Sequence, residues 1–323
     1  MKVKIISARQ AALIASSANS IFLAGFTGEP LVLLDAVLSE PEIWKDKILT
    51  GAFIPGVNDR DFSSLGVGTT VETLFSTQGL QRGDAERRVA HLPMHYSDFW
   101  VRLSRPGLID CVFMTVPAPT KDGSIGCGLT VDFAAAPIAQ DTQLIGIISS
   151  NMPDVKEGPR LPIERFAALV EDDTALPTFD PGEPDKNSLT IANYIIELLS
   201  SGDTLQFGLG KIPAAVLEGL APSGLSGLGF HAGMISPEML PAIDANVFTK
   251  GVMTGVALGN QKFYQEVSKR PGIRFSPVDM THSISILYQI PRLVSVNLVI
   301  EVDLTGQANC EYLTGMQISG QGG

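Results

Sequence analysis

The alternation of apolar and polar positions predicts helices and buried strands in turn along the chain. Segment 188–200 places apolar side chains at helical spacing, which predicts an amphipathic helix. Segments 109–116 and 143–150 are nearly continuous apolar runs, as expected for strands of a parallel sheet covered on both faces. Segment 294–304 instead alternates apolar with polar residues. This period predicts a strand whose polar face is either a solvated edge or one wall of a cleft.

A unit of helix, strand, glycine loop and helix occurs twice. Residues 18–37 and 201–220 align without gaps, and each follows a helical stretch, at 7–18 and at 188–200. The coinciding positions are Asn19 with Gly202, Gly25 with Gly208, Pro30 with Pro213, and Leu34 with Leu217. Asn and Gly tolerate the left-handed conformation that ends a helix, and Pro suits the first turn of the next. We therefore predict two similar α/β domains related by duplication.

A proline-rich, charged segment separates the two halves. The stretch LPTFDPGEPDKN, Leu176 to Asn187, has few apolar residues, as is typical of a linker. We assign residues 1–176 to an N-terminal domain, 177–187 to the linker and 188–323 to a C-terminal domain. The chain has 323 residues, of which 45% are hydrophobic, so each half can bury a core of its own.

Charge and cysteine content exclude several classes of partner. The net charge of −11 argues against a nucleic-acid or anionic-membrane surface, because both require a basic face. It leaves open an anionic small molecule, which needs only a local site. No apolar run approaches ~20 residues, so no membrane span is expected. Three cysteines without CxxC spacing are typical of a reduced, cytoplasmic protein.

The second glycine loop, QFGLGKIP, is the first candidate site. Gly208 and Gly210 allow the backbone to approach a ligand closely, and the helix expected after them points N–H groups toward it. Lys211 adds a positive charge. This set suits a phosphate, or the oxyanion formed at a thioester carbonyl. A tight turn is the alternative, because the loop lacks the third glycine of the dinucleotide motif and the Gly-Lys-Ser/Thr ending of a P-loop.

Histidine and serine motifs add no second site. His91 and His95 are separated by Pro93, which disfavours a helical metal-binding face, and no cysteine or carboxylate lies at ligand spacing. We therefore expect no metal. A GxSxG nucleophile elbow does not occur in the sequence, and Ser236 followed by Pro237 suits the start of a helix.

Several stretches form a pattern when they are read in order. In the first half these are LPMHYSDF, VPAPTKDGSIGCG and NMP; in the second half they are SGDTLQFGLGKIPAAVLEGL, GFHAGMIS, VNLVIEVDLTGQANCE and SGQGG. Together they resemble the acetyl-CoA hydrolase/transferase family, which includes the acetate and 4-hydroxybutyrate CoA-transferases. The resemblance covers nearly the whole chain. It implies two NagB-like CoA-transferase α/β domains with largely parallel or mixed sheets, and an active site in the cleft between them.

The resemblance also implies a set of site residues. In the family a glutamate attacks the acyl-CoA carbonyl and forms a glutamyl-CoA thioester. Asn297 would lie near the thioester, and the loop Gln206–Gly210 would line the same pocket. The family's GxGG loop corresponds here to Gly320, Gly322 and Gly323. Coenzyme A, as part of an acyl-CoA substrate, is the implied cofactor, with a small carboxylic acid as the second substrate.

The chain departs from the family at the nucleophile. Where the family has His-Ser/Thr-Glu-Met, this sequence has His231, Ala232, Gly233 and Met234. Glycine has no side chain, so a glutamyl-CoA thioester cannot form at position 233, and His231 stays a candidate catalytic residue beside it. Glu29, in the first glycine loop, would face the cleft from the other domain and is a candidate carboxylate, although a helix start also explains it.

Three functions are compatible with this departure. The first is hydrolysis, decarboxylation or carbon–carbon chemistry on an acyl-CoA whose carbonyl is polarised by backbone N–H groups. The second is CoA transfer between carboxylic acids through another carboxylate, such as Glu29. The third is a non-catalytic acyl-CoA-binding or partner subunit. In the family the second domain continues past the GxGG loop, so either the numbered sequence omits a tail or this half is shortened. We expect a homo-oligomer, or a partner subunit that completes a shortened second domain.

Overall fold

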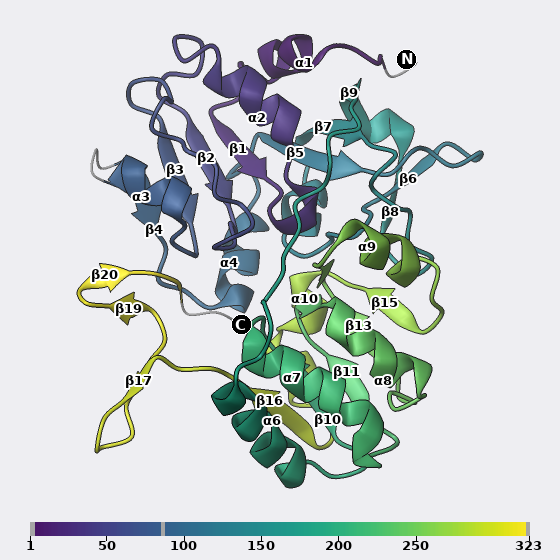
Figure 1. Cartoon of the computed structure of the whole chain (residues 1–323). Coiled ribbons are helices and arrows are strands. Elements are labelled where there is room, and N and C mark those ends of the chain that lie inside the picture. Colours follow the sequence, from purple (N-terminus) through teal and green to yellow (C-terminus); the bar gives the residue numbers. More distant parts are fainter. Residues whose placement is uncertain (1–3, 85–87, 321–323) are drawn as a thin grey trace.

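The computed structural model of the chain describes residues 4–84 and 88–320. Two parallel sheets follow each other along the sequence, and helices pack on each of them (Figure 1). The helices of the first part are α1 (Ala8–Ala15), α2 (Leu31–Leu38), α3 (Gln78–Asp84), α4 (Tyr96–Leu103) and α5 (Ala135–Ile138). Those of the second are α6 (Lys186–Leu198), α7 (Lys211–Leu220), α8 (Leu240–Asp244), α9 (Gln261–Val267), α10 (Val278–Thr281) and α11 (Ile284–Leu287).

The first sheet has the strand order β4-β3-β2-β1-β5-β7-β9, with parallel pairing throughout. Its strands are β1 (Ser20–Leu23), β2 (Ile48–Gly51), β3 (Thr70–Thr73), β4 (Val89–His91), β5 (Cys111–Val116), β7 (Gln143–Ile148) and β9 (Phe166–Glu171). Every residue of β5 is buried, which confirms the sequence expectation for an apolar run covered on both faces.

The second sheet has the order β15-β13-β11-β10-β16 and is also parallel. Its strands are β10 (Thr204–Phe207), β11 (Gly229–His231), β13 (Val252–Thr254), β15 (Ile273–Phe275) and β16 (Leu293–Val296). Short two-stranded pairs lie outside the two main sheets: β6 (Ser124–Gly126) with β8 (Arg160–Pro162), β12 (Met234–Ile235) with β14 (Val256–Ala257), β17 (Glu301–Val302) with β18 (Ala308–Asn309), and β19 (Tyr312–Leu313) with β20 (Met316–Gln317).

The two halves share one arrangement. The order β4-β3-β2-β1-β5 recurs as β15-β13-β11-β10-β16, and α1 packs against α2 as α6 packs against α7. In both sheets the direction of strand addition reverses beside the first strand, β1 or β10. Ligands of open parallel α/β sheets bind at such switch points, outside the carboxyl ends of the strands. Both glycine loops lie at these ends, because they follow β1 and β10 directly.

Two local expectations are wrong. Gly202 has a positive φ of 87°, as predicted, but its counterpart Asn19 is not in the left-handed region. Helix α1 already ends before Asn19, with Ser16 as its C-cap. The Asn19 N–H donates instead to the Asp110 carboxylate. The predicted strand 294–304 ends at Val296. Its partner β10 ends at Phe207, opposite Val296, so no backbone partner continues the ladder, and the chain leaves the sheet as the arm of residues 297–320 (yellow in Figure 1).

A seam of hydrogen bonds between the two halves is formed by residues 129–132 of the first half and 255–257 of the second. Val131 N–H donates to the Gly255 carbonyl at 2.9 Å, and Ala257 N–H donates to the Leu129 carbonyl at 2.9 Å. An antiparallel bridge lies between these bonds, at Thr130. The predicted linker has no helix or strand before α6, which begins at Lys186. The boundaries 1–176 and 188–323 remain predictions.

Candidate functional site

The second glycine loop is open at the carboxyl end of β10. A β-carbon added at Gly208 would meet no atom within 4 Å, and Gly208 is exposed. Gly210 has φ 126° and occupies the N-cap of α7 without a side-chain hydrogen bond. The first N–H groups of α7 therefore have no side-chain cap, and a ligand can reach them. Lys211 is exposed, and its Nζ lies 4.0 Å from the β-carbon position of Gly182 in the linker.

Two of the predicted residues meet beside this loop. Asn297 Nδ2 donates to Ser295 Oγ at 3.0 Å, and Ser295 Oγ donates to Gln206 Oε1. Gln206 belongs to β10 and Asn297 follows β16, which are the strands on either side of the switch point. The structure therefore places Gln206 and Asn297 together at the crevice where parallel sheets bind ligands.

Gly233 lies just past the carboxyl end of β11, in the next crevice. Its carbonyl accepts hydrogen bonds from the N–H groups of Gly255 and Val256, each at 2.9 Å. A β-carbon at this position would lie 2.8 Å from His282 Cε1 and 3.3 Å from His282 Nε2. A contact of 2.8 Å is closer than van der Waals distance, so the imidazole of His282 occupies the path that a side chain at 233 would take.

The His282 ring is fixed from two sides. Its Nδ1 lies 2.9 Å from Thr281 Oγ1, and its ring centroid is 4.6 Å from that of Tyr96, on α4 of the first domain. Burial, together with the neighbouring His231, lowers the pKa of His282 to about 4. Burial also lowers the pKa of His231, whose Nε2 has no hydrogen-bond partner. Both imidazoles are therefore neutral at pH 7.

Asp132 brings a carboxyl group to the same seam. It is 2% exposed, and neither of its side-chain oxygens has a hydrogen-bond partner. Burial raises its pKa to about 8, so the carboxyl group is mainly protonated at pH 7. Its φ of 23° is a strained conformation of the kind that clusters at functional sites. Oδ1 lies 3.2 Å from the β-carbon position of Gly255, the residue that donates to the Gly233 carbonyl.

The end of the arm reaches this seam as well. Gly320 is buried, and a β-carbon there would lie 2.1 Å from the Leu74 carbonyl oxygen and 3.0 Å from the Phe75 ring. The Phe75 and Tyr96 rings are 6.0 Å apart, and Tyr96 in turn contacts His282. Gly320 therefore packs beside Phe75, whose ring lies next to the Tyr96 ring at the seam. The other two predicted glycines, Gly322 and Gly323, lie outside the described residues.

The first glycine loop is closed. Glu29 is 4% exposed; its Oε2 accepts from Asn58 Nδ2 at 2.8 Å, and its Oε1 has no partner. Burial raises the Glu29 pKa to about 7, which the Asn58 hydrogen bond partly opposes. Thr115 donates to the Glu29 carbonyl at 2.9 Å. The prediction that Glu29 faces the cleft stays a prediction, since its described contacts are with residues of the first domain and of the adjoining linker region.

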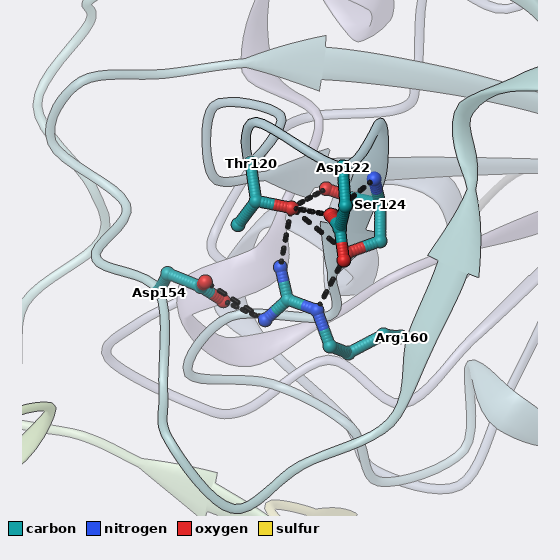
Figure 2. Close-up of polar contacts among 5 residues, drawn as sticks. All are labelled: Thr120, Asp122, Ser124, Asp154 and Arg160. Atoms are coloured by element: carbon teal, nitrogen blue, oxygen red, sulfur yellow. Dashed lines mark hydrogen bonds and ion pairs between the residues drawn. The ribbon is translucent and has the colours of Figure 1, made fainter.

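A polar cluster anchors the segment that leads to Asp132 (Figure 2). Arg160 donates to both oxygens of Asp154, at 2.9 and 2.8 Å, and to Ser124 Oγ at 2.9 Å. Thr120 and Asp122 complete the cluster; hydrogen bonds from Thr120 and Ser124 lower the pKa of Asp122 to about 2. These contacts tie β8 to β6, after which the chain runs directly to the seam at 129–132.

A separate hollow extends from His231 along the second sheet. Its volume is about 430 Å³, and Lys250 and Arg274 are among the residues that line it. Lys250 donates to the Gly202 carbonyl, and Arg274 lies 3.9 Å from Glu157. Both cations therefore already have protein partners, which leaves the loop after β10 as the better candidate for an anion.

Some candidate residues could not be found from sequence patterns. Tyr96 lies in the LPMHYSDF motif, but nothing in the local sequence points to Asp132 or His282, which only the fold brings together. Among the described residues, no group of three or more His, Cys, Asp or Glu is placed to hold a metal ion. Within the same residues, no helix is long and apolar enough to cross a membrane.

Comparison with known proteins covers both halves of the chain. The N-terminal domain model of acetyl-CoA hydrolase/transferase matches residues 1–179, and the C-terminal domain model of the same enzymes matches residues 259–323. The 4-hydroxybutyrate coenzyme A transferase of Clostridium kluyveri is 24% identical over 347 residues, which cover 100% of this chain and 77% of the relative. The acetyl-CoA hydrolase of Candida albicans is 28% identical over 263 residues, covering 67% of this chain and 49% of the relative.

The fold matches solved structures over almost its whole length. RipA from Yersinia pestis superposes with a TM-score of 0.84 and 23% identity, covering 96% of this chain and 76% of RipA. Agreement at this level of identity establishes the fold, and the expectation of CoA-transferase-type α/β domains is confirmed.

Proposed function

The chain belongs to the acetyl-CoA hydrolase/transferase family, and on that premise we propose that it hydrolyses an acyl-CoA thioester at the domain seam without a covalent glutamyl intermediate. Water, rather than an enzyme carboxylate, attacks the thioester carbon. The carbon–sulfur bond then breaks and the products are a carboxylic acid and CoA. Coenzyme A enters only as part of the substrate.

The surroundings of Gly233 carry this proposal. The position has no side chain, and the His282 ring fills the space into which one would project, 2.8 Å from the β-carbon position. A glutamate here would have to displace a half-buried ring that packs at a tilt against Tyr96. The ping-pong route, in which an enzyme carboxylate accepts CoA, therefore has no nucleophile at this position.

The rest of the site suits a thioester. The free N–H groups at the start of α7 and the exposed Gly208 offer donors to an oxyanion or a phosphate. Gln206 and Asn297 lie at the same switch point, joined through Ser295. The acyl-CoA would extend from this loop toward Gly233. A small carboxylic acid is then the product of hydrolysis, and would be the acceptor in the transfer alternative.

CoA transfer through Glu29 is the second candidate. One Glu29 oxygen is buried without a partner, and its pKa is raised to about 7. This is the environment of a carboxyl group that can change its charge near neutral pH. The route requires the closed first loop to open, because Glu29 is 4% exposed.

The exposed arm supports the expectation of a homo-oligomer or a partner subunit. Large apolar side chains of the arm are exposed to solvent: Leu298, Val299, Ile300, Val302, Leu304 and Met316. Exposed apolar side chains gathered on one segment are typical of a surface that another chain covers. We propose a cytoplasmic assembly of this kind, testable by light scattering after gel filtration.

The function is tested by incubating the protein with acyl-CoAs of different chain length and measuring free thiol. Hydrolysis predicts thiol release that needs no carboxylic acid acceptor, and no CoA adduct in the intact-protein mass spectrum. Transfer through Glu29 predicts acceptor-dependent release and a hydroxylamine-sensitive adduct that the Glu29→Gln variant lacks. CoA binding by calorimetry with neither activity would indicate a non-catalytic binding subunit.

A further inference from the structure

We infer that His282 replaces the missing carboxylate as the catalytic proton acceptor, its Nε2 taking a proton from the water that attacks the thioester. This inference rests on the proposed function. It assigns a role to a residue that lies far from Gly233 in the sequence but meets it in the fold.

The ring lies where the nucleophile's side chain would begin. His282 Nε2 is 3.3 Å, and Cε1 2.8 Å, from the β-carbon position of residue 233. The ring is held in this place by its tilted contact with the Tyr96 ring and by the His282 backbone N–H, which donates to the Val278 carbonyl at 2.8 Å. A base that is held in position loses little entropy in reaching the reacting atoms.

Hydrogen bonding leaves Nε2 as the free nitrogen. Thr281 Oγ1 lies 3.4 Å from the Pro277 carbonyl, to which it donates its single proton. Because that proton is then engaged, we assign the proton of the 2.9 Å contact between this oxygen and His282 Nδ1 to the imidazole. A neutral imidazole that carries its proton on Nδ1 presents a lone pair at Nε2. Nε2 is the nitrogen that faces the position of residue 233.

The neighbouring groups keep His282 neutral before substrate binds. Tyr96 packs on the ring, and His231 lies on the same side of the seam. Asp132, which interacts electrostatically with Tyr96, is itself kept mainly protonated because burial raises its pKa to about 8. No negative charge in these contacts stabilises an imidazolium in the free protein. An oxyanion forming at the thioester carbon would supply that charge, so His282 becomes more basic as the reaction proceeds.

The step balances without any further reactant. As the water oxygen bonds to the thioester carbon, one water proton passes to Nε2. The tetrahedral oxyanion then collapses, the carbon–sulfur bond breaks, and the thiolate of CoA takes the proton back from the imidazolium. The products are the carboxylic acid and the CoA thiol, and His282 returns to its neutral state.

The kinetic test compares His282→Gln with His95→Gln. His95 is an exposed histidine that precedes α4, so its substitution controls for the general loss of a histidine. We expect His282→Gln to lower kcat by about 100-fold or more, the usual range for a general base, with KM changed little. His95→Gln should retain the activity. Partial rescue of His282→Gly by added imidazole is expected, and a purely structural role would not produce it.

A measurement independent of turnover uses protein with ¹⁵N-labelled histidine and acetonyl-CoA, a ketone analogue that cannot be hydrolysed. We expect the His282 Nε2 resonance to shift on binding while that of His95 does not. If acetonyl-CoA and CoA both fail to bind, the proposed function is overturned. Binding that leaves His282 unshifted, or a His282→Gln variant with wild-type kcat, overturns this inference and leaves the proposed function standing.

Discussion

The two glycine loops occupy the same place in two copies of one topology, yet one is closed and the other open. A β-carbon at Gly25 would lie 2.1 Å from the Ala52 carbonyl oxygen, whereas at the equivalent Gly208 it would meet nothing within 4 Å. Asn58 hydrogen-bonds the backbone of Phe26 and the Glu29 carboxylate in the first loop. Among its described contacts, the second loop has no side chain that hydrogen-bonds it in this way.

This difference shows how the same loop can differ in accessibility between two copies of one fold. Both loops follow the first strand of a sheet at a switch point. In the first copy, the Phe26 N–H and one carboxylate oxygen of Glu29 are engaged within the domain. In the second copy, the start of α7 is left for a ligand. We therefore propose that the first loop mainly stabilises its domain and that the second loop binds the ligand.

The largest expected effect comes from adding one methyl group to each loop. Gly25→Ala should lower the free energy of unfolding by about 3 kcal/mol, because the new β-carbon overlaps a backbone oxygen that cannot move freely. Gly208→Ala, the matched change, should stay within about 0.5 kcal/mol of wild type. Urea unfolding followed by circular dichroism measures both. Equal losses would show that the second loop is as closed as the first.

Glu29→Gln removes the buried titrating group of the closed loop. Burial raises the Glu29 pKa from its ordinary value of 4.5 to about 7, so folding favours the protonated form. Its stabilising contribution is complete below pH 4.5 and is lost as pH rises through 7. The melting temperature of Glu29→Gln should therefore rise relative to that of the wild type as the pH increases from 5 to 8. Glu164→Gln, at an exposed site, should show no such trend; a pH-independent difference for Glu29→Gln would contradict a buried, titrating carboxyl.

How much of this could be read from the sequence depends on whether the signal is local. The buried strands, the helix at 188–200 and the turn at Gly202 follow from periodicity and residue type. The extent of β16 could not be read in this way, since it is fixed by the length of β10. Asp132 and His282 carry no local signal either, because their roles arise from contacts across the domain seam.

Lys211→Ala tests the open loop as an anion site. Lys211 is exposed at the start of α7, where a positive charge would assist the helix N–H groups. We expect CoA to bind about 3- to 10-fold more weakly at low salt, with a smaller difference at high salt because exposed charges are screened. Calorimetry measures this, with Lys262→Ala on α9 as the control. Unchanged CoA affinity would place the phosphates elsewhere.

The smallest effect is expected from Arg160→Lys in the cluster of Figure 2. Lysine cannot reproduce the hydrogen bonds of the guanidinium group to Asp154, Ser124 and Thr120. The ion pair of Arg160 with Asp154 is partly exposed, so water weakens it. The loss of unfolding free energy should be about 1 kcal/mol. Backbone amide hydrogen exchange at residues 127–132 should also become faster in this variant. An unchanged exchange rate there would show that the seam segment does not depend on this anchor.

The source of the oxygen in the first product molecule tests the central claim most directly. The protein, in excess over an acyl-CoA, is mixed with substrate in H₂¹⁸O, and the released acid is analysed after a single turnover. Direct attack by water predicts one ¹⁸O atom in the acid and none incorporated into the protein. An acid without ¹⁸O, together with ¹⁸O in a glutamate or aspartate of the protein, would show that an enzyme carboxylate attacks first and would contradict the account.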